Sequence, residues 1–293
     1  SGYGNTMNVG MDKATGEYIG IVESDDYVEK NMFERLYHTA CKYNAEIVKS
    51  DHYIFSTKEG KQNKKIQYIC PEKYYNRVLN VDICEEIYDF AMMNWTGIYK
   101  TEFIRENNIR HNETPGASFQ DNGFWFQALS LAKSIVMLHE AFYYYRQDNP
   151  NSSINSKAKV YCICDEYEYI QDFVIKNKRI CDEHFTKFFT KKIFNYLHSF
   201  DRIADEFKVP FLERAALEFK GDLKLPYLDF EKLDPWVLDT VNRIIDDPKL
   251  YYLEDRNYLL HQKYDSVHEK LIQLRESNEF KKGLEIKKIL RMK

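Results

Sequence analysis

The feature that most constrains the fold is residues 17–27, EYIGIVESDDY, where a short apolar run leads directly into three carboxylates. The run over 18–22 is β-branched and aromatic, as is typical of a strand buried on both faces. Glu23, Asp25 and Asp26 follow, and anions this close raise one another's pKa or need a cation between them. Ligands of open α/β sheets bind beyond the carboxyl ends of the strands. The cluster therefore predicts a Mg²⁺ or Mn²⁺ site, and an acidic turn that caps the next helix is the alternative.

Composition narrows the class of protein. The chain has 293 residues, 44% hydrophobic and 30% charged, which is enough for one large core or two smaller ones. The net charge of −4 gives no general attraction to nucleic acid, so no nucleic-acid partner is expected. Six cysteines without CxxC spacing argue against a zinc site or a disulfide framework. No signal peptide and no apolar run of roughly 18–20 residues is visible, so we expect a soluble, cytoplasmic protein.

The first part of the chain alternates between helical and extended patterns. The expected elements are helices over 5–14 and 31–44 and strands over 18–22 and 45–56. Asn5 or Thr6 would cap the first helix, and Gly16 would end it in the left-handed conformation. Asn44 would end the second helix. This alternation is half of a doubly wound sheet, which would need further strands before Ser1. We therefore expect a fragment that lacks its N-terminal βα units.

The rest of the chain divides into a mixed part and a helical part. The expected elements are a polar hairpin or loop over 58–69, a helical stretch over 71–92, a strand over 94–100, a helix over 101–108, a loop over 109–119, a helix from 120, a strand over 134–147 and a turn over 148–153. Charged and aromatic helical patterns dominate after about 157. We place a boundary near 155, which gives a partial catalytic domain over 1–155 and a helical domain over 156–293.

Two further residues suggest chemistry. Asp121 is expected in the first turn of a helix, where the helix dipole keeps a carboxylate ionised and able to accept a proton from a hydroxyl nucleophile. In isolation, such an aspartate more often only stabilises the dipole. Arg146 ends an aromatic strand, and an arginine fork suits a diphosphate, although a lone arginine is more often a surface charge.

Four segments together resemble the bacterial family 2 glycosyltransferases, which have the GT-A fold. The segments are NVGMDKATGEYIGIVESDDYVEKNMFERLY, NWTGIYKTEFIRENNIRH, FQDNGFWFQAL and YYYRQDNPNSSI, in the order in which the family has them. Four ordered segments are a more specific signal than any one of them. The resemblance implies an α/β fold, namely a truncated GT-A domain with a Rossmann-like, mostly parallel sheet, followed by an all-α C-terminal region.

The resemblance also implies a site. Residues 23–25 take the position of the family's DxD motif. Asp25 would hold Mn²⁺ or Mg²⁺ against the nucleotide diphosphate, Glu23 would lie near the ribose or the metal, and Asp26 would support them. Asp121 would be the catalytic base. The other implied nucleotide- or substrate-binding residues are Asn8, Trp95, Gln120 and Arg146.

The implied function is inverting transfer of a sugar from a nucleotide sugar, expected to be a UDP-sugar, to a hydroxyl group. The acceptor would be a saccharide or a lipid-linked molecule of bacterial surface polysaccharide or glycolipid synthesis. One alternative is another metal-dependent nucleotide-sugar enzyme, but the Gly-rich phosphate loop of a nucleotidyltransferase is absent from the sequence. A second alternative is a non-catalytic helical interaction module on a degenerate transferase fragment.

The sequence departs from the family at several positions. Glu23 replaces the first Asp of the motif, Gln120 replaces the Glu before the base, and Thr6-Met7 stand where Ala-Arg is usual. The family's first strands and their nucleoside pocket have no counterpart. We therefore expect UDP and Mn²⁺ to stabilise this chain only slightly against heat.

The C-terminal part is open to three interpretations: packing, acceptor recognition and homo-oligomerisation. Its tail, residues 280–293, mixes basic and apolar side chains. Such a tail is more often a solvated terminal helix. The alternative is peripheral contact with the anionic inner face of the membrane, where lipid-linked acceptors are found.

Overall fold

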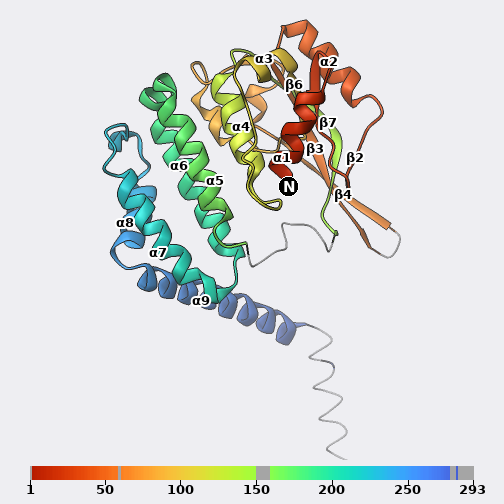
Figure 1. The fold of residues 1–293 in the computed structure, drawn as a ribbon. Coiled ribbons are helices and arrows are strands. Elements are labelled where there is room, and N and C mark those ends of the chain that lie inside the picture. Colours follow the sequence, from red (N-terminus) through yellow and green to blue (C-terminus); the bar gives the residue numbers. More distant parts are fainter. Residues whose placement is uncertain (1, 59–60, 150–158, 278–281, 283–293) are drawn as a thin grey trace, which may run out of the picture.

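The computed structural model describes residues 2–58, 61–149, 159–277 and 282. Figure 1 shows a sheet flanked by helices, with a group of helices packed beside it and one long helix that extends away from the body. The predicted boundary near 155 and most of the tail 280–293 lie outside the described residues.

Within the described residues, the sheet has seven strands. They are β1 (Tyr18–Gly20), β2 (Tyr27–Val28), β3 (Ile47–Lys58), β4 (Lys61–Gln67), β5 (Val78–Leu79), β6 (Gly97–Lys100) and β7 (Ile135–Arg146). The order is β1-β6-β3-β7-β2, with β4 paired to β3 and β5 paired to β7. The strands β3 and β7 are parallel, and the other strand pairs are antiparallel. The prediction of a mostly parallel sheet is therefore wrong, because an apolar run does not reveal the direction of its neighbours.

In the described part of the chain, four α-helices accompany the sheet. They are α1 (Tyr3–Lys13), α2 (Met32–Tyr43), α3 (Thr101–Glu106) and α4 (Gln120–Leu131). Asn44 ends α2 with φ 47°, as predicted. The cap prediction for α1 is wrong, because the helix starts after Gly2 and the Tyr3 N–H donates to Gly116 O of the predicted loop. It ends at Ala14 in an extended conformation, before Gly16 is reached.

The strand before the carboxylates is shorter and less buried than expected. Ile19 and Ile21 are buried, but Val22 is 46% exposed, so the run alternates and is not buried on both faces. Its neighbour β6 pairs with it antiparallel, so Glu17 O accepts a hydrogen bond from the N–H of Thr101 at the start of α3. The carboxylates after β1 lie in the turn that leads to β2, which pairs with β7 at the other end of the strand order.

The helix predicted over 71–92 does not form. The segment contains the short 3₁₀ helices η1 (Glu72–Tyr74) and η2 (Glu85–Asp89), with β5 between them. Asn80 is one reason, because its Oδ1 accepts hydrogen bonds from the N–H groups of Asp82 and Ile83. A short polar side chain that bonds nearby backbone groups competes with a helix. The polar stretch after β3 forms the β3–β4 hairpin, as predicted.

The helical region consists mainly of α-helices. They are α5 (Cys162–Lys176), α6 (Lys178–Arg202), α7 (Asp205–Asp222), α8 (Pro235–Asp246) and α9 (Pro248–Glu276), with the 3₁₀ helix η4 (Phe230–Lys232) before α8. Its buried side chains continue the core of the sheet, and Phe126 of α4 meets Phe188 of α6 edge to face at 5.9 Å. This packing places α6 beside the start of α4. No helix in the described ranges has the length and hydrophobicity needed to cross a bilayer.

Candidate active site

Two cavities adjoin at the N-terminus of α4. The first, of about 390 Å³, is lined by Tyr3, Glu23, Ser24, Asp25, Asn94, Trp95, Ala117, Ser118, Phe119, Gln120, Asp121, Tyr145 and Asn149. The second, of about 380 Å³, is lined by Met92, Met93, Trp95, Ser118, Phe119, Asp121, Asn122, Tyr145, Lys159, Asn195, His198, Ser199, Arg202 and Ile203. Asp121 lines both cavities. Of the residues predicted to form the site, five line the first cavity: Glu23, Asp25, Trp95, Gln120 and Asp121.

The first cavity is acidic. The Glu23 carboxylate accepts a hydrogen bond of 2.7 Å from the Tyr3 hydroxyl, and Asp25 accepts one of 2.6 Å from the Asn149 amide. Burial raises the pKa of Glu23, and the negative charges of Asp121, Asp26 and Asp25 raise it further. The hydrogen bond from Tyr3 lowers this pKa but does not outweigh them. This mutual repulsion would be relieved by a cation.

Asp26 supports the cluster from behind. Its Oδ2 accepts a hydrogen bond from the Tyr143 hydroxyl, and its Oδ1 accepts one from the Arg146 N–H, both at 2.8 Å. The same Tyr143 oxygen accepts a hydrogen bond from the Glu23 N–H at 2.9 Å. Tyr143 on β7 therefore fixes the turn that carries the carboxylates, a role that the sequence did not reveal.

Asp121 lies in the first turn of α4, as predicted. Burial raises its pKa to about 6, although the N–H groups of Asp121 and Asn122 and the charge of Lys49 act in the opposite direction. A carboxylate with a pKa near 6 is ionised at neutral pH and is a stronger base than an ordinary aspartate. Phe119, two residues before Asp121 at the helix N-cap, has φ 67°, an unusual conformation for a bulky side chain.

A buried lysine below Asp121 was not predicted. Lys49 in β3 is 1% exposed, and its Nζ donates hydrogen bonds to Ala91 O at 3.2 Å and Met93 O at 2.5 Å. Burial lowers the pKa of Lys49 to about 7, although the charge of Asp121 favours the ammonium. The signal in the sequence was a lysine within an apolar strand, since lysine is almost never fully buried without a partner.

Two side chains, Gln120 of α4 itself and Glu166 of α5, hold the start of α4. Gln120 is buried; its Oε1 accepts from the Ser118 N–H at 2.5 Å and its Nε2 donates to Thr114 Oγ1 at 2.9 Å. Glu166 of α5 accepts a hydrogen bond of 2.8 Å from the Gly123 N–H. Gln120 therefore positions the loop before the helix, while Glu166 binds its first turn.

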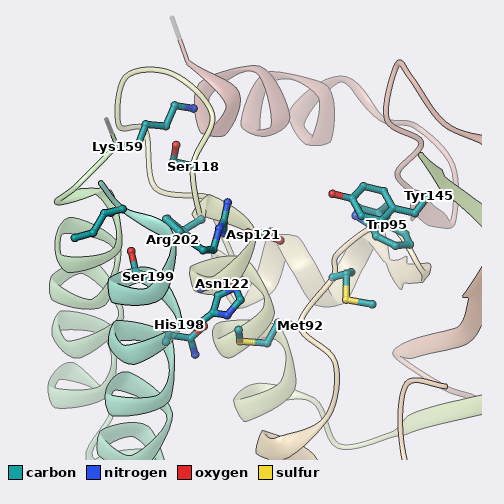
Figure 2. Close-up of a pocket in the computed structure, with 14 residues that line it drawn as sticks. Met92, Trp95, Ser118, Asp121, Asn122, Tyr145, Lys159, His198, Ser199 and Arg202 are labelled. Carbon is teal, nitrogen blue, oxygen red and sulfur yellow. The ribbon is translucent and has the colours of Figure 1, made fainter. Parts of the chain in front are cut away.

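Aromatic rings form one wall of both cavities. Trp95 stacks on Tyr143 and Tyr145, with ring centroids 4.3 and 5.1 Å apart. Figure 2 shows Trp95 and Tyr145 on one side of Asp121, and Ser199, His198 and Arg202 of α6 on the other. A flat apolar surface beside a carboxylate is a suitable support for a sugar ring or a base.

The second cavity has basic groups at its edge. Lys159 Nζ donates to Ala117 O at 2.5 Å, and the Arg202 guanidinium lies 5.9 Å from the Phe119 ring centroid. His198 completes this set on α6. Asp121 is the only carboxylate among the described residues that line this cavity. The two cavities thus differ in charge, acidic on the β1 side and basic on the α6 side.

Three predicted residues line neither cavity: Asp26, which supports the cluster from behind, Asn8 and Arg146. Asn8 is buried, and its Nδ2 donates to His111 O at 3.0 Å and to Glu113 Oε1 at 2.9 Å, so it ties α1 to the loop before α4. The Arg146 guanidinium is exposed and forms an ion pair of 2.7 Å with Asp148. Their predicted roles at the nucleotide and the diphosphate stay predictions.

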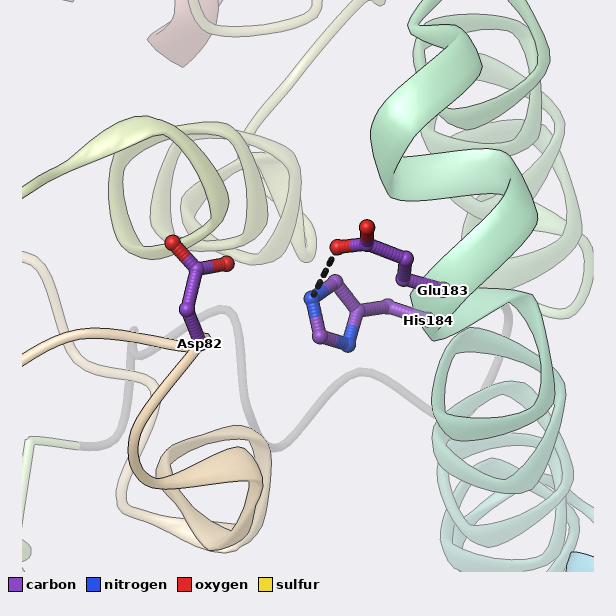
Figure 3. Close-up of side chains that lie close together, drawn as sticks. All are labelled: Asp82, Glu183 and His184. Carbon is purple, nitrogen blue, oxygen red and sulfur yellow. Dashed lines mark ion pairs between the residues drawn. The ribbon is translucent and has the colours of Figure 1, made fainter.

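The carboxylates of the first cavity suit a hard cation such as Mg²⁺ or Mn²⁺ that takes its remaining ligands from a substrate. Protein sites for Mg²⁺ often supply only one or two carboxylates, and phosphate oxygens complete the shell. In the described ranges, the one group of three acidic or histidine ligands close enough to hold an ion together is elsewhere, at Asp82, Glu183 and His184 (Figure 3). There Arg179 already pairs with Asp82 at 2.5 Å and with Glu183 at 3.9 Å, and so supplies the positive charge.

Comparison with known proteins gives a consistent result. Residues 1–99 match the family model of glycosyl transferase family 2. The chain is 29% identical over 203 residues to the uncharacterized glycosyltransferase EpsJ of Bacillus subtilis, covering 67% of this chain and 51% of EpsJ. It is 27% identical over 214 residues to the cholesterol galactosyltransferase of Borreliella burgdorferi, covering 69% and 57%. The chain thus spans about half the length of these two relatives.

Solved structures agree on the fold. S. aureus TarS 1-349 in complex with UDP-GlcNAc superposes with a TM-score of 0.60 at 18% identity, covering 87% of this chain and 72% of that one. The likeness includes the sheet and most of the helical region, as the resemblance to a GT-A domain with a helical extension implied. Residues 1–99 thus match the glycosyl transferase family 2 model, and the chain is similar in fold to TarS.

Proposed function

We propose that the protein is an inverting glycosyltransferase that moves a sugar from a UDP-sugar to a hydroxyl group of a saccharide or lipid-linked acceptor. The observation that carries this proposal is that Asp25 and Asp121 line one cavity. The family match and the named relatives support the reaction class. The TarS complex with UDP-GlcNAc supports a UDP-sugar donor.

The donor diphosphate is assigned to the acidic end of the first cavity. Asp25 and Glu23 are the side chains that would hold Mg²⁺ or Mn²⁺ there, and Tyr3 and Asn149 orient them. When bound, the cation supplies positive charge that neutralises the departing diphosphate. Trp95 and Tyr145 offer the flat surface against which the donor sugar can lie.

Asp121 is assigned as the base. It removes the proton of the acceptor hydroxyl, the oxygen attacks the anomeric carbon, and the bond from that carbon to the diphosphate oxygen breaks. A single displacement inverts the anomeric centre, and the proton passes from Asp121 to solvent. A pKa of about 6 suits this role because the base is ionised at neutral pH and still accepts a proton in the transition state.

The acceptor is assigned to the second cavity, on the α6 side of Asp121. Since Lys159, His198 and Arg202 line this cavity, we expect an acceptor that carries a phosphate or carboxylate group. The helical region would then contribute to acceptor recognition, one of the interpretations that the sequence allowed. This placement leaves Asp121 between donor and acceptor, as its role requires.

The test is turnover of UDP-sugars by the whole protein. We expect release of UDP from at least one sugar of a panel in the presence of Mn²⁺ or Mg²⁺, and loss of that release with a chelator. Asp246→Asn, at an exposed carboxylate at the end of α8, is a suitable control for loss of a carboxylate outside the cavities. No UDP release from any sugar, with the protein folded, would favour the non-catalytic interaction module.

A further inference from the structure

Among the described residues, helix α9 has no packing partner over most of its length. Residues 256–274 are all exposed, and Figure 1 shows the helix extending away from the body of the molecule. Only its first turns pack, where Tyr251 and Tyr252 lie against Phe200 with ring centroids 6.2 and 6.4 Å away. Helices in proteins owe most of their stability to a packed apolar face, so a bare helix of this length indicates a surface that something else covers.

One side of the exposed part is an apolar stripe. Its members recur at intervals of three, four and seven residues, which places them on one face of an α-helix. The stripe consists of Leu253, Leu260, Tyr264, Val267, Leu271 and Leu274. Each of these large side chains is at least 44% exposed, so the stripe is open to solvent along its whole length. Contiguous exposed apolar surface of this kind marks an interaction site.

Both edges of the stripe are basic or imidazole-bearing. At about 100° per residue, Lys263 and Lys270 follow one edge, after Arg256, which pairs with Asp205 at 3.4 Å, and His261 and His268 follow the other. The acidic residues of the exposed part lie on the far face, among them Asp265 and Glu269. A helix with an apolar stripe, one lysine-bearing edge and an acidic far face is suited to lie in the plane of an anionic membrane surface. There the lysine-bearing edge meets anionic headgroups while the stripe enters the acyl boundary.

A second copy of the chain fits this surface less well. In a parallel coiled coil, a residue that flanks the apolar seam of one helix faces the flanking residue five positions further along the other helix. Arg256 would then face His261, and Lys263 would face His268, so neither step brings opposite charges together. Glu254 is already paired with Arg243 at 2.6 Å. Charge therefore favours an anionic lipid surface over self-association.

We propose that the apolar stripe of α9 binds the protein peripherally to anionic lipid bilayers. This extends an idea that the sequence suggested only for the tail 280–293, and it does not depend on the proposed transferase activity. The tail adds Lys281, Lys282, Lys287 and Lys288 to the same end of the chain.

The test is flotation of the purified protein with vesicles. We expect binding to phosphatidylcholine vesicles that contain 30% phosphatidylglycerol, and at least tenfold less binding to pure phosphatidylcholine. The double variant Leu260→Glu/Leu271→Glu should lose at least tenfold in the bound fraction. Lys263→Glu/Lys270→Glu should reduce binding to the anionic vesicles specifically. Leu259→Glu, an equally exposed leucine outside the stripe, is the matched control and should bind as the parent does.

The variants change exposed side chains only, so the melting temperature should stay within a degree or two of the parent and confirm folding. The proposal would be overturned if Leu260→Glu/Leu271→Glu floated as well as the parent and removal of residues 280–293 abolished flotation. That result would place the membrane contact in the tail. A second copy would be the occupant if the parent protein did not bind vesicles but was oligomeric by light scattering, and Leu260→Glu/Leu271→Glu was monomeric. That result would also overturn the proposal.

Discussion

Asp25, just after β1, and Asp121, in the first turn of α4, line the same cavity of about 390 Å³. The two residues come from distant parts of the chain, and the intervening strands β3 and β6 bring their elements together. Asp25 is set in a repulsive acidic cluster, whereas Asp121 is a buried carboxylate with a raised pKa. Under the proposed function, Asp25 would be a cation ligand and Asp121 the base, both within this one cavity.

Asp121→Asn should abolish transfer while leaving donor binding unchanged. Loss of a general base costs roughly 10²–10⁴-fold in turnover, and the amide has the same size as the acid. Turnover number and UDP affinity measured in parallel separate the two effects, with Asp246→Asn as control. Retention of a third or more of the parent turnover would remove Asp121 from the role of base.

Asp25→Asn should weaken the response to Mn²⁺. An amide lacks the charge that attracts the cation, so we expect the Mn²⁺ concentration for half-maximal turnover to rise by at least about tenfold. Electron paramagnetic resonance of Mn²⁺ in the presence of UDP gives a readout that does not depend on turnover. Asp239→Asn on α8, outside both cavities, is the control. An unchanged Mn²⁺ affinity in Asp25→Asn would move the metal site away from this carboxylate.

Lys49→Met should shift the pH dependence of the rate. The base is active when ionised, so the rate should fall as the pH drops through about 6. Lys49 is still charged in that range because its pKa is about 7, and its charge favours the Asp121 carboxylate. Removing it should move the midpoint of the acid limb to higher pH. A lower melting temperature with an unmoved midpoint would make Lys49 a packing residue only.

The sequence predicted those parts of the site that depend only on the pattern of neighbouring residues. The carboxylates after residues 18–22 and Asp121 at a helix start are local features, since a strand end and a first helical turn depend on a few neighbouring residues. The order of four segments then linked them to a known fold. What the sequence could not provide was the interaction between distant side chains, such as the Tyr143 hydrogen bond to Asp26 or the effect of the Lys49 charge on Asp121.

The errors in the fold have physical causes. Strand direction depends on the path of the connecting loops. The strand β6 runs antiparallel to both β1 and β3, and its apolar pattern is compatible with either direction. The stretch over 71–92 has helical composition, but the side chain of Asn80 and the left-handed Asn76, with φ 57°, turn the backbone away from a helix. Propensity averaged over such a window does not register single turn-forming residues.

Glu166→Gln should change how stability depends on pH. Burial raises the pKa of Glu166 to about 8, although hydrogen bonds from Asn112 and Gly123 act to lower it. Because the folded pKa lies above the ordinary value of 4.5, the folded protein holds a proton that the unfolded chain releases. The stabilisation from the neutral acid is complete below about pH 4.5 and is lost as the pH rises through about 8. Within this window the free energy of unfolding should fall by roughly 1.4 kcal/mol per pH unit.

The neutral amide of Glu166→Gln removes this dependence. Melting temperatures of the parent and the variant, measured between pH 5 and pH 9, should therefore converge or cross, with the parent losing roughly 3 °C per pH unit relative to the variant. Glu168→Gln, at an exposed position of the same helix α5, should follow the parent at every pH. Parallel curves for Glu166→Gln and the parent would show that Glu166 keeps one protonation state over this range, and that its contact with Gly123 holds α4 in place without titrating.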